Sequence, residues 1–237
     1  QIAKQEGSKH HFPRGTKTGL AMHGLMEKID FEAPSHSAEC RKLLSNLGLE
    51  DSWLAMLEEW IDKILSTDLG PLKLKDLKKQ DRVAELEFFF SLSKTEKTIQ
   101  FLFEKGFISS WGHKDSHMEG FMTGIIDLVF RQNGKYYLLD YKSNFLGASD
   151  ISYNAENLSL SMKRHNYHLQ YLIYTVALHR MLKRDLASYS YEKHFGGVYY
   201  FFLRGVDCEK TNGVFFTRPD QVLIEKIDGY MSVGNEK

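Results

Sequence analysis

Residues 124–144 read GIIDLVFRQNGKYYLLDYKSN, which is two apolar runs on either side of an Asn-Gly pair. Asn-Gly between strand-like runs is a strong short-range signal for a two-residue β-hairpin turn. With that turn, Asp127 lies directly opposite Asp140, and both side chains point to the same face of the hairpin. Lys142 follows Asp140 by two residues and points to the same face. The stretch therefore predicts a hairpin that carries two facing carboxylates and a lysine.

Two facing carboxylates on apolar strands repel one another, and burial increases the free energy of that arrangement. A divalent cation with oxygen ligands would offset the repulsion. The alternative is an exposed hairpin face on which both carboxylates are solvated and Lys142 is an ordinary salt-bridge partner. The hairpin by itself leaves both interpretations open.

The composition is that of a globular protein. The chain has 237 residues, enough for one large domain, and is 42% hydrophobic and 13% aromatic. Lys+Arg and Asp+Glu are equal at 31 each, so a polyanionic partner would have to be attracted by local patches of charge. Only Cys40 and Cys208 are present, which excludes a disulfide scaffold and a four-cysteine cluster within this chain. Without a long apolar run or a signal peptide, the sequence predicts a cytoplasmic protein with no membrane attachment.

The order of the predicted elements indicates the fold class. Residues 1–18 are polar and basic and predict a linker from an upstream region, followed by a domain at residues 19–237. The first part of that domain, through residue 80, has mainly helical patterns. Strand patterns cover residues 83–92, 196–203 and 213–217, and one long helical pattern covers residues 160–182. This order predicts an α/β or α+β domain, with a central mixed sheet flanked by helices and an N-terminal helical part.

Two further pairs of polar residues follow helical spacing. His23 and Glu27 are four residues apart on a predicted helix and share one face. Their alternative interpretation is an ordinary surface pair. Gln170 and Tyr174 share a face of the helix predicted at residues 160–182.

The combined residue types suit metal-assisted hydrolysis of a phosphodiester. Asp127 and Asp140 can hold Mg²⁺ through their oxygens, with water in the remaining positions. Such a metal polarises a phosphoryl oxygen and lowers the pKa of a bound water. Lys142 can orient or deprotonate that water, or stabilise charge on the phosphate.

Several motifs together resemble one nuclease family. In chain order they are Gly19-x-x-x-His23, Glu85-Leu-Glu-Phe88, Gly124-Ile-Ile-Asp127, Asp140-Tyr-Lys142 and Gln170-x-x-x-Tyr174. Their order and identity resemble the PD-(D/E)XK nucleases, and more narrowly the RecB-type nucleases, over nearly the whole chain from residue 15 to residue 219. The resemblance implies the restriction-endonuclease-like fold.

The resemblance also implies a metal site. By motif position, the ligands are the side chains of His23, Asp127 and Asp140 and the backbone carbonyl of Tyr141. The expected ion is Mg²⁺, and Mn²⁺ or Ca²⁺ can occupy the same site. Asp127, Asp140 and Lys142 are the implied catalytic residues, with Lys142 as the catalytic lysine.

Four further positions take supporting roles in this resemblance. Gln170 and Tyr174 match a motif that lines the site or contacts the DNA backbone. Glu85 matches a motif position of less defined role, and Glu27 is expected to support His23. No further cofactor is implied.

The family context implies a larger assembly. In RecB-type proteins the nuclease domain follows a superfamily 1 helicase and acts with RecC and RecD subunits. The chain has no G-x-x-x-x-G-K-[ST] phosphate loop, so the ATPase would lie outside it. The expected activity is of the exodeoxyribonuclease V type: Mg²⁺-dependent hydrolysis of single-stranded DNA, and of double-stranded DNA once the helicase has unwound it, during double-strand break repair by homologous recombination. The alternatives are an inactive nuclease-like module that docks partners or DNA, and a free-standing endonuclease of the same fold.

Overall fold

A mixed β-sheet forms the centre of the protein. The structure, a computed structural model, describes residues 8–70, 72–92, 95–107, 120–207 and 211–232. Five strands are found there: β1 (Arg82–Leu92), β2 (Gly120–Gln132), β3 (Lys135–Lys142), β4 (Phe195–Phe202) and β5 (Val214–Thr217). They lie in the order β1-β2-β3-β4-β5, and only β3 and β4 are parallel. The predicted mixed sheet is confirmed.

The hairpin of β2 and β3 has the predicted register. Asn133 and Gly134 both have positive φ, 50° and 75° respectively, as a two-residue turn matched to the strand twist requires. The ladder then runs from the turn back to the Leu128–Leu139 pair, in the predicted alignment.

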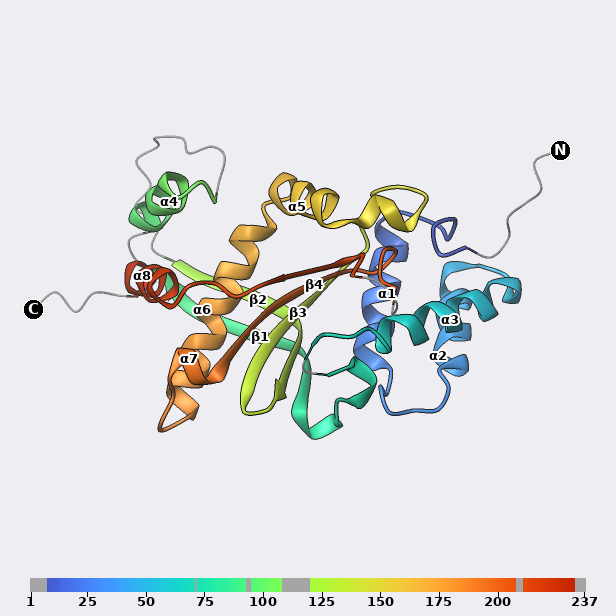
Figure 1. Ribbon diagram of the computed structural model, residues 1–237, viewed down its shortest axis with the longest axis horizontal. Coiled ribbons are helices and arrows are strands. Elements are labelled where there is room, and N and C mark those ends of the chain that lie inside the picture. The colour runs from blue at the N-terminus through green and yellow to red at the C-terminus, as the bar shows by residue number, and fades with distance from the viewer. Residues whose placement is uncertain (1–7, 71, 93–94, 108–119, 208–210, 233–237) are drawn as a thin grey trace, which may run out of the picture.

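Helices cover both faces of the sheet. They are α1 (Thr16–Lys28), α2 (Ser37–Leu47), α3 (Leu54–Leu65), α4 (Thr95–Glu104), α5 (Ala155–Arg164), α6 (Tyr167–Asp185), α7 (Tyr191–His194) and α8 (Gln221–Met231). Helices α1–α3 gather at one end of the molecule, with α4 and α8 at the other (Figure 1). None of the described helices is both long enough and apolar enough to cross a bilayer.

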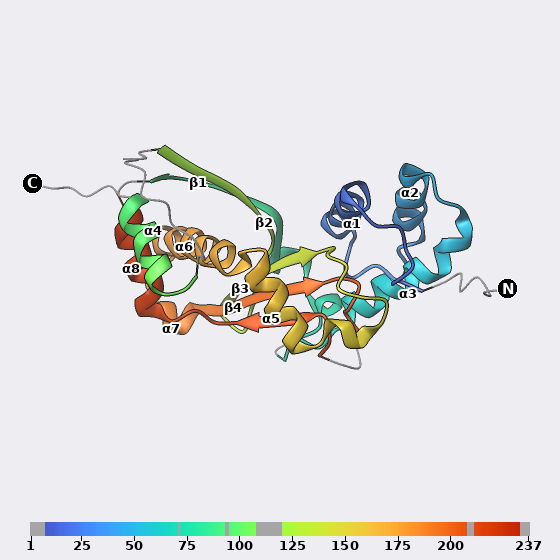
Figure 2. The same cartoon turned by 90° about the horizontal axis from the view of Figure 1, so that it is seen from above.

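Alternate residues of β4 supply two separate cores. Tyr199 and Phe201 pack in a core with α1–α3, whereas Val198, Tyr200 and Phe202 pack in a second core with α5, α6 and α8. This alternation is the two-residue period of a strand that is covered on both faces. Seen from above, α1 and α2 stand apart from the layer that contains α6 (Figure 2).

The single helix predicted at residues 160–182 is wrong, because two helices occupy this region. Helix α5 ends at Arg164 and α6 begins at Tyr167. Between them Asn166 has φ 55°, a left-handed conformation that interrupts a right-handed helix. Asparagine adopts this conformation more readily than most residues, and the apolar spacing carries no signal for it. The break lets α5 turn away at the start of α6.

Residues 8–18 are packed onto the domain. Phe12 is completely buried in the core of α1–α3, and α1 begins at Thr16, so the predicted boundary at residue 18 falls inside a helix. Arg204, just after β4, donates hydrogen bonds to the backbone carbonyls of Lys9, Phe12 and Pro13. Residues 1–7 lie outside the described ranges. The origin of this segment in an upstream helicase region stays a prediction.

Candidate active site

Asp127 lies at an interruption of the sheet. The β1–β2 ladder skips Glu85 and Asp127, although the neighbours of both residues are paired. Glu85 has φ 51°, which is uncommon for a residue with a side chain and costs about 1–3 kcal/mol. Strained backbone of this kind often occurs at functional sites, and here it faces a carboxylate predicted to be catalytic.

Asp127 and Asp140 lie just beyond the end of the β2–β3 ladder, and their position directly opposite one another stays a prediction. The β2–β3 ladder ends one pair earlier, at Leu128–Leu139. Asp127 Oδ2 instead accepts a hydrogen bond of 2.7 Å from the backbone N–H of Tyr141. A charged acceptor gives a stronger hydrogen bond to this N–H than a neutral one. The carboxylate of Asp127 therefore reaches across to β3 beside Asp140.

His23 comes to this point from α1. Its Nδ1 lies 3.4 Å from Asp127 Oδ2, and its ring packs edge-on against the ring of Tyr141. Burial lowers the pKa of His23. The hydrogen bond and charge of Asp127, together with the charge of Asp140, raise the pKa by more than burial lowers it, so the net shift is upward. The imidazole is thus held in a negative environment, as a ligand of a cation would be.

A glycine allows α1 to approach β3. A Cβ at Gly19 would lie 2.7 Å from Oγ of Ser143, the residue that follows Lys142. Because Gly19 has no side chain, the first turns of α1 pack directly on the end of β3. This contact brings His23, one turn later on the helix, to the site.

Lys142 and Asp140 form a buried ion pair on β3. Asp140 is 3% exposed, and its Oδ2 lies 2.6 Å from Lys142 Nζ. Burial raises the pKa of Asp140 and the positive charge of Lys142 lowers it; the effect of burial is larger. The burial penalty of the pair is offset only if both groups have further partners.

Lys142 has such partners on α6 and β4. Its Nζ donates a 2.9 Å hydrogen bond to Gln170 Oε1, which also accepts one of 3.0 Å from the Tyr200 hydroxyl. The Nε2 of Gln170 donates to the hydroxyl of Tyr174 at 2.9 Å. The ammonium also lies 4.1 Å from the ring centroid of Tyr167, within cation–π range. Gln170 of the predicted pair therefore contacts Lys142 directly, and Tyr174 contacts Gln170.

The remaining acidic candidates line a cavity of about 490 Å³, which we call the acidic cavity. Glu27, Glu85 and Asp127 all line it, together with His23. Burial raises the pKa of Glu85, and the charges of Asp127 and Glu27 raise it further. Glu27 and Glu85 thus lie beside the predicted metal ligands, which agrees with supporting roles.

The predicted ligands are imidazole and carboxylate groups, which suit a divalent cation. In the structure only some of them lie together. Among the described residues, no three His, Cys, Asp or Glu side chains converge as metal ligands. His23 and Asp127 are together, whereas the carboxylate of Asp140 is paired with Lys142. Asp140 Oδ2 is buried and accepts no hydrogen bond of normal geometry from the described part of the chain. A buried carboxylate oxygen in this state fits a cation. The ligand set, including the carbonyl of Tyr141, stays a prediction.

The sequence patterns did not identify Tyr167, Tyr200 and Ser143 as parts of the site. Tyr200 lies in a strand predicted to be buried, and its hydroxyl needs a partner there. That need was a usable signal, but the partner, Gln170, is distant in the sequence and only the fold brings it near. Tyr167 and Ser143 carried no local signal.

Comparison with known proteins agrees with this geometry. The model of the PD-(D/E)XK nuclease superfamily matches residues 3–226. The chain belongs to the PD-(D/E)XK nuclease superfamily. The matched residues include the whole β2–β3 hairpin, with the Asp140-Tyr141-Lys142 segment on β3.

The curated relatives of this PD-(D/E)XK chain are longer proteins. It is 40% identical over 227 residues to the RecBCD enzyme subunit RecB of Escherichia coli, covering 92% of this chain and 19% of that protein. The same subunit of Haemophilus influenzae is 39% identical over 235 residues, which is 96% of this chain and 19% of that protein. The same subunit of Mycobacterium tuberculosis is 28% identical over 263 residues, which is 94% of this chain and 24% of that protein. The chain thus spans about a fifth of the length of these relatives.

Proposed function

We propose that this chain is a divalent-metal-dependent deoxyribonuclease that hydrolyses phosphodiester bonds of DNA. The observation that carries the proposal is the position of Lys142. Its ammonium is held by Asp140, Gln170 and an aromatic ring, beside the His23–Asp127 pair. A fixed cation next to the carboxylates of Asp127 and Asp140 is suited to a phosphate and a metal ion.

In this proposal His23, Asp127, Asp140 and the carbonyl of Tyr141 hold the cation, which we expect to be Mg²⁺. When bound, the ion supplies Lewis acidity toward the phosphoryl group and activates water. Lys142 stabilises negative charge on the phosphate or orients the attacking water.

The surrounding residues hold these groups in place. Gln170 fixes the position of the Lys142 ammonium, and Tyr174 fixes Gln170. Glu85 and Glu27 maintain the negative potential of the acidic cavity.

The relatives support a wider context for this activity. Because they are named as RecB subunits of RecBCD enzymes, we infer that the chain is the nuclease part of a RecB-type subunit. It would then act on strands that the attached helicase unwinds, together with RecC and RecD subunits. The process would be repair of double-strand breaks by homologous recombination, in the cytoplasm.

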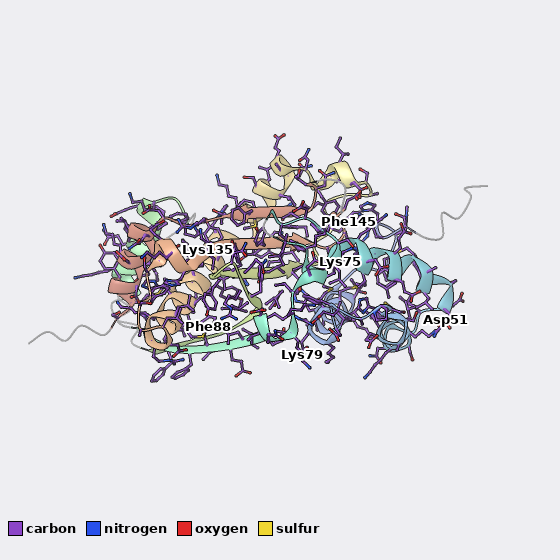
Figure 3. The ribbon with its side chains drawn as sticks, turned by 60° about the horizontal axis from the view of Figure 1, so that its bottom comes forward. Asp51, Lys75, Lys79, Phe88, Lys135 and Phe145 are labelled. Carbon is purple, nitrogen blue, oxygen red and sulfur yellow. The ribbon has the colours of Figure 1, made fainter. Side chains whose placement is uncertain are left out.

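The proposal is tested by cleavage of linear single-stranded DNA in Mg²⁺. Lys142→Met and Asp140→Asn should each lower the cleavage rate by at least about a hundredfold, because each removes charge from the reacting phosphate or its metal. Lys75→Met, which changes an exposed lysine (Figure 3), should cleave like the unmodified chain. Chelation with EDTA should abolish cleavage by all variants. Unchanged cleavage by Lys142→Met would contradict the assignment.

The same assay separates the two alternatives. DNA binding without any cleavage by the unmodified chain would favour an inactive docking module. Cleavage of circular single-stranded DNA without any helicase present would favour a free-standing endonuclease.

A further inference from the structure

A second cavity adjoins the acidic cavity at α1. It has a volume of about 450 Å³, and Arg14, Lys142 and Arg204 contribute to its lining. We call it the basic cavity, because no Asp or Glu of the described residues lines it. The two cavities are adjacent: they share the lining residues Thr16, Gly19, His23 and Ser143. A region suited to cations therefore lies directly beside one suited to anions.

The uncapped start of α1 opens into the basic cavity. Gly15 is the N-cap and has no side chain to accept a hydrogen bond from the first N–H groups of the helix. Gly15 and Thr16 both line the cavity. The free N–H groups at a helix start, together with the positive end of the helix dipole, attract anions.

Thr18 supplies a separate indication of a ligand. It is 5% exposed and lines the basic cavity, yet its hydroxyl makes no hydrogen bond with any described residue. The hydroxyl is not among the fully buried polar atoms of the described residues, so the little exposure that Thr18 keeps leaves this oxygen accessible from the cavity. A ligand oxygen in the cavity would be a hydrogen-bond partner for it.

Arg14 also lines the basic cavity, and its positive charge is not paired with a carboxylate of the described residues. Its guanidinium stacks on Phe145, with its carbon 3.3 Å from the ring centroid, and forms no ion pair with a described carboxylate. Figure 3 shows Phe145 beyond β3, at the end of the sheet nearer the N-terminal helices. Arg204 differs, because three of its N–H groups donate to backbone carbonyls and hold the guanidinium in place, so its main contribution to the cavity is charge.

We propose that the basic cavity binds a phosphate group of the DNA strand next to the scissile one. The ligands are the Arg14 guanidinium, the Thr18 hydroxyl and the free N–H groups at the start of α1. The inference rests on the proposed nuclease function. Lys142 lines the basic cavity, Asp127 lines the acidic cavity, and His23 lines both. A DNA strand that crosses the site would therefore place one phosphate in the basic cavity and the neighbouring, scissile phosphate beside the acidic cavity.

Binding without cleavage tests the ligands. The affinity of the intact chain for fluorescent single-stranded DNA is measured by anisotropy in EDTA over a range of salt concentrations. Arg14→Gln should bind about tenfold more weakly and lower the salt slope by about one, the values expected for one lost phosphate contact. Thr18→Val should weaken binding, and Thr18→Ser should restore it. Arg41→Gln changes an exposed arginine of α2 and should bind normally.

Unchanged affinity and salt slope in Arg14→Gln and Thr18→Val would overturn the inference. Melting temperatures near that of the unmodified chain are required of both variants. Since Thr18 is buried, Arg14→Gln, at an exposed position, decides the result if the valine variant fails to fold.

Cleavage of modified DNA tests the position of the phosphate. Oligonucleotides that carry one neutral methylphosphonate are cut in Mg²⁺, with the modification moved along the strand. The unmodified chain should be slowed by a modification at one fixed distance from the cut, and Arg14→Gln should lose that sensitivity. If cleavage were slowed only when the 5′-terminal phosphate is removed, and by no methylphosphonate within the strand, the assignment to a backbone phosphate would be overturned. Arg14-dependent binding by a chain that cleaves nothing would retain the phosphate site and overturn the proposed function.

Discussion

At the scale of single residues, the surroundings of Lys142 explain how a lysine can be held for chemistry. Its ammonium contacts Asp140 and Gln170 and lies over the rings of Tyr167 and Tyr200. Gln170 is a neutral acceptor, so it fixes the ammonium without cancelling its charge. A charge that is held before the substrate binds needs little reorganisation during the reaction.

The first prediction concerns Gln170. Gln170→Leu removes the acceptor shared by Lys142 and Tyr200, so the ammonium becomes less well placed. We expect kcat to fall about ten- to hundredfold with a smaller change in KM, because misplacement of a catalytic group acts mainly on the chemical step. Steady-state cleavage of DNA measures both constants. Gln100→Leu, which affects an exposed hydrogen bond on α4, is the control, and equal kcat values for the two variants would contradict the role.

The second prediction concerns Cys40 and pH. Burial raises the pKa of its thiol to about 12, and the charge of Glu58 adds to the effect. Below the ordinary pKa of a thiol both the folded and the unfolded state keep the proton, and the contribution of the buried neutral thiol to stability is fully present; above it only the unfolded thiol loses its proton. That contribution declines as pH rises above the ordinary value toward about 12.

Thiol reactivity at pH 8.5 checks this prediction, in a Cys208→Ser chain because Cys208 lies outside the described residues. Cys40 should react with a disulfide reagent only at the rate of unfolding, since the thiolate is the reactive form. In denaturant the same thiol should react within the mixing time. Fast reaction of the folded protein would show that Cys40 is accessible.

At the scale of elements, the site depends on two departures from regular structure. The β2–β3 ladder stops before Asp127, and this frees the Asp127 carboxylate to bond the backbone of β3. Helix α1 approaches the end of β3 through Gly19. The strand break and the helix contact together bring an imidazole beside a carboxylate.

The third prediction compares the two glycines of α1. A Cβ at Gly24 meets nothing within 4 Å, so Gly24→Ala should stabilise the protein by about 1 kcal/mol through helix propensity. At Gly19 the new Cβ meets the Ser143 hydroxyl, so Gly19→Ala should gain less stability and reduce cleavage. Urea unfolding and DNA cleavage measure the two effects. Addition of Ser143→Ala should restore cleavage to Gly19→Ala, and failure of that rescue would contradict the contact.

At the scale of the whole molecule, the segment before α1 is joined to the residues just after β4. Arg204 is buried, and its hydrogen bonds connect the end of β4 to the segment before α1, about 190 residues away in the sequence. Phe12 completes this contact by packing edge-on against Trp53 and Trp60. The segment before α1 therefore contributes to the stability of the domain.

The fourth prediction tests that contribution. Phe12→Ala should lower the free energy of unfolding by about 3–5 kcal/mol, because it empties a fully buried position. Leu160→Ala, at a site 61% exposed, should change it by less than about 0.5 kcal/mol. Urea titration gives both values. If Phe12→Ala were as mild as Leu160→Ala, the segment would be a linker after all.

The whole chain has zero formal net charge, yet charge is separated around α1. The acidic cavity and the basic cavity share residues of this helix and differ in every charged lining group except His23. Local separation of this kind allows a protein without net charge to bind a cation and a phosphate side by side.

Local patterns were sufficient for the strands of the sheet and for the family. The Asn-Gly turn and the two-residue alternation predicted the register of β2 and β3, because both depend only on neighbours along the chain. The order of motifs predicted the family, which the match over residues 3–226 confirms. The break at Asn166 was missed, since apolar spacing does not record a single left-handed residue.

The amino-acid sequence thus determined by itself the fold class, the family and a set of candidate residues for the chemistry, because residue type and spacing along an element are local properties. Only the tertiary structure decided which of them meet. The approach of His23 to Asp127, the contact of Lys142 with Gln170 and Tyr200, and the end of the ladder before Asp140 all depend on packing between distant segments. Such contacts form where buried polar groups find partners across the core, and no short stretch of sequence contains both members of the pair.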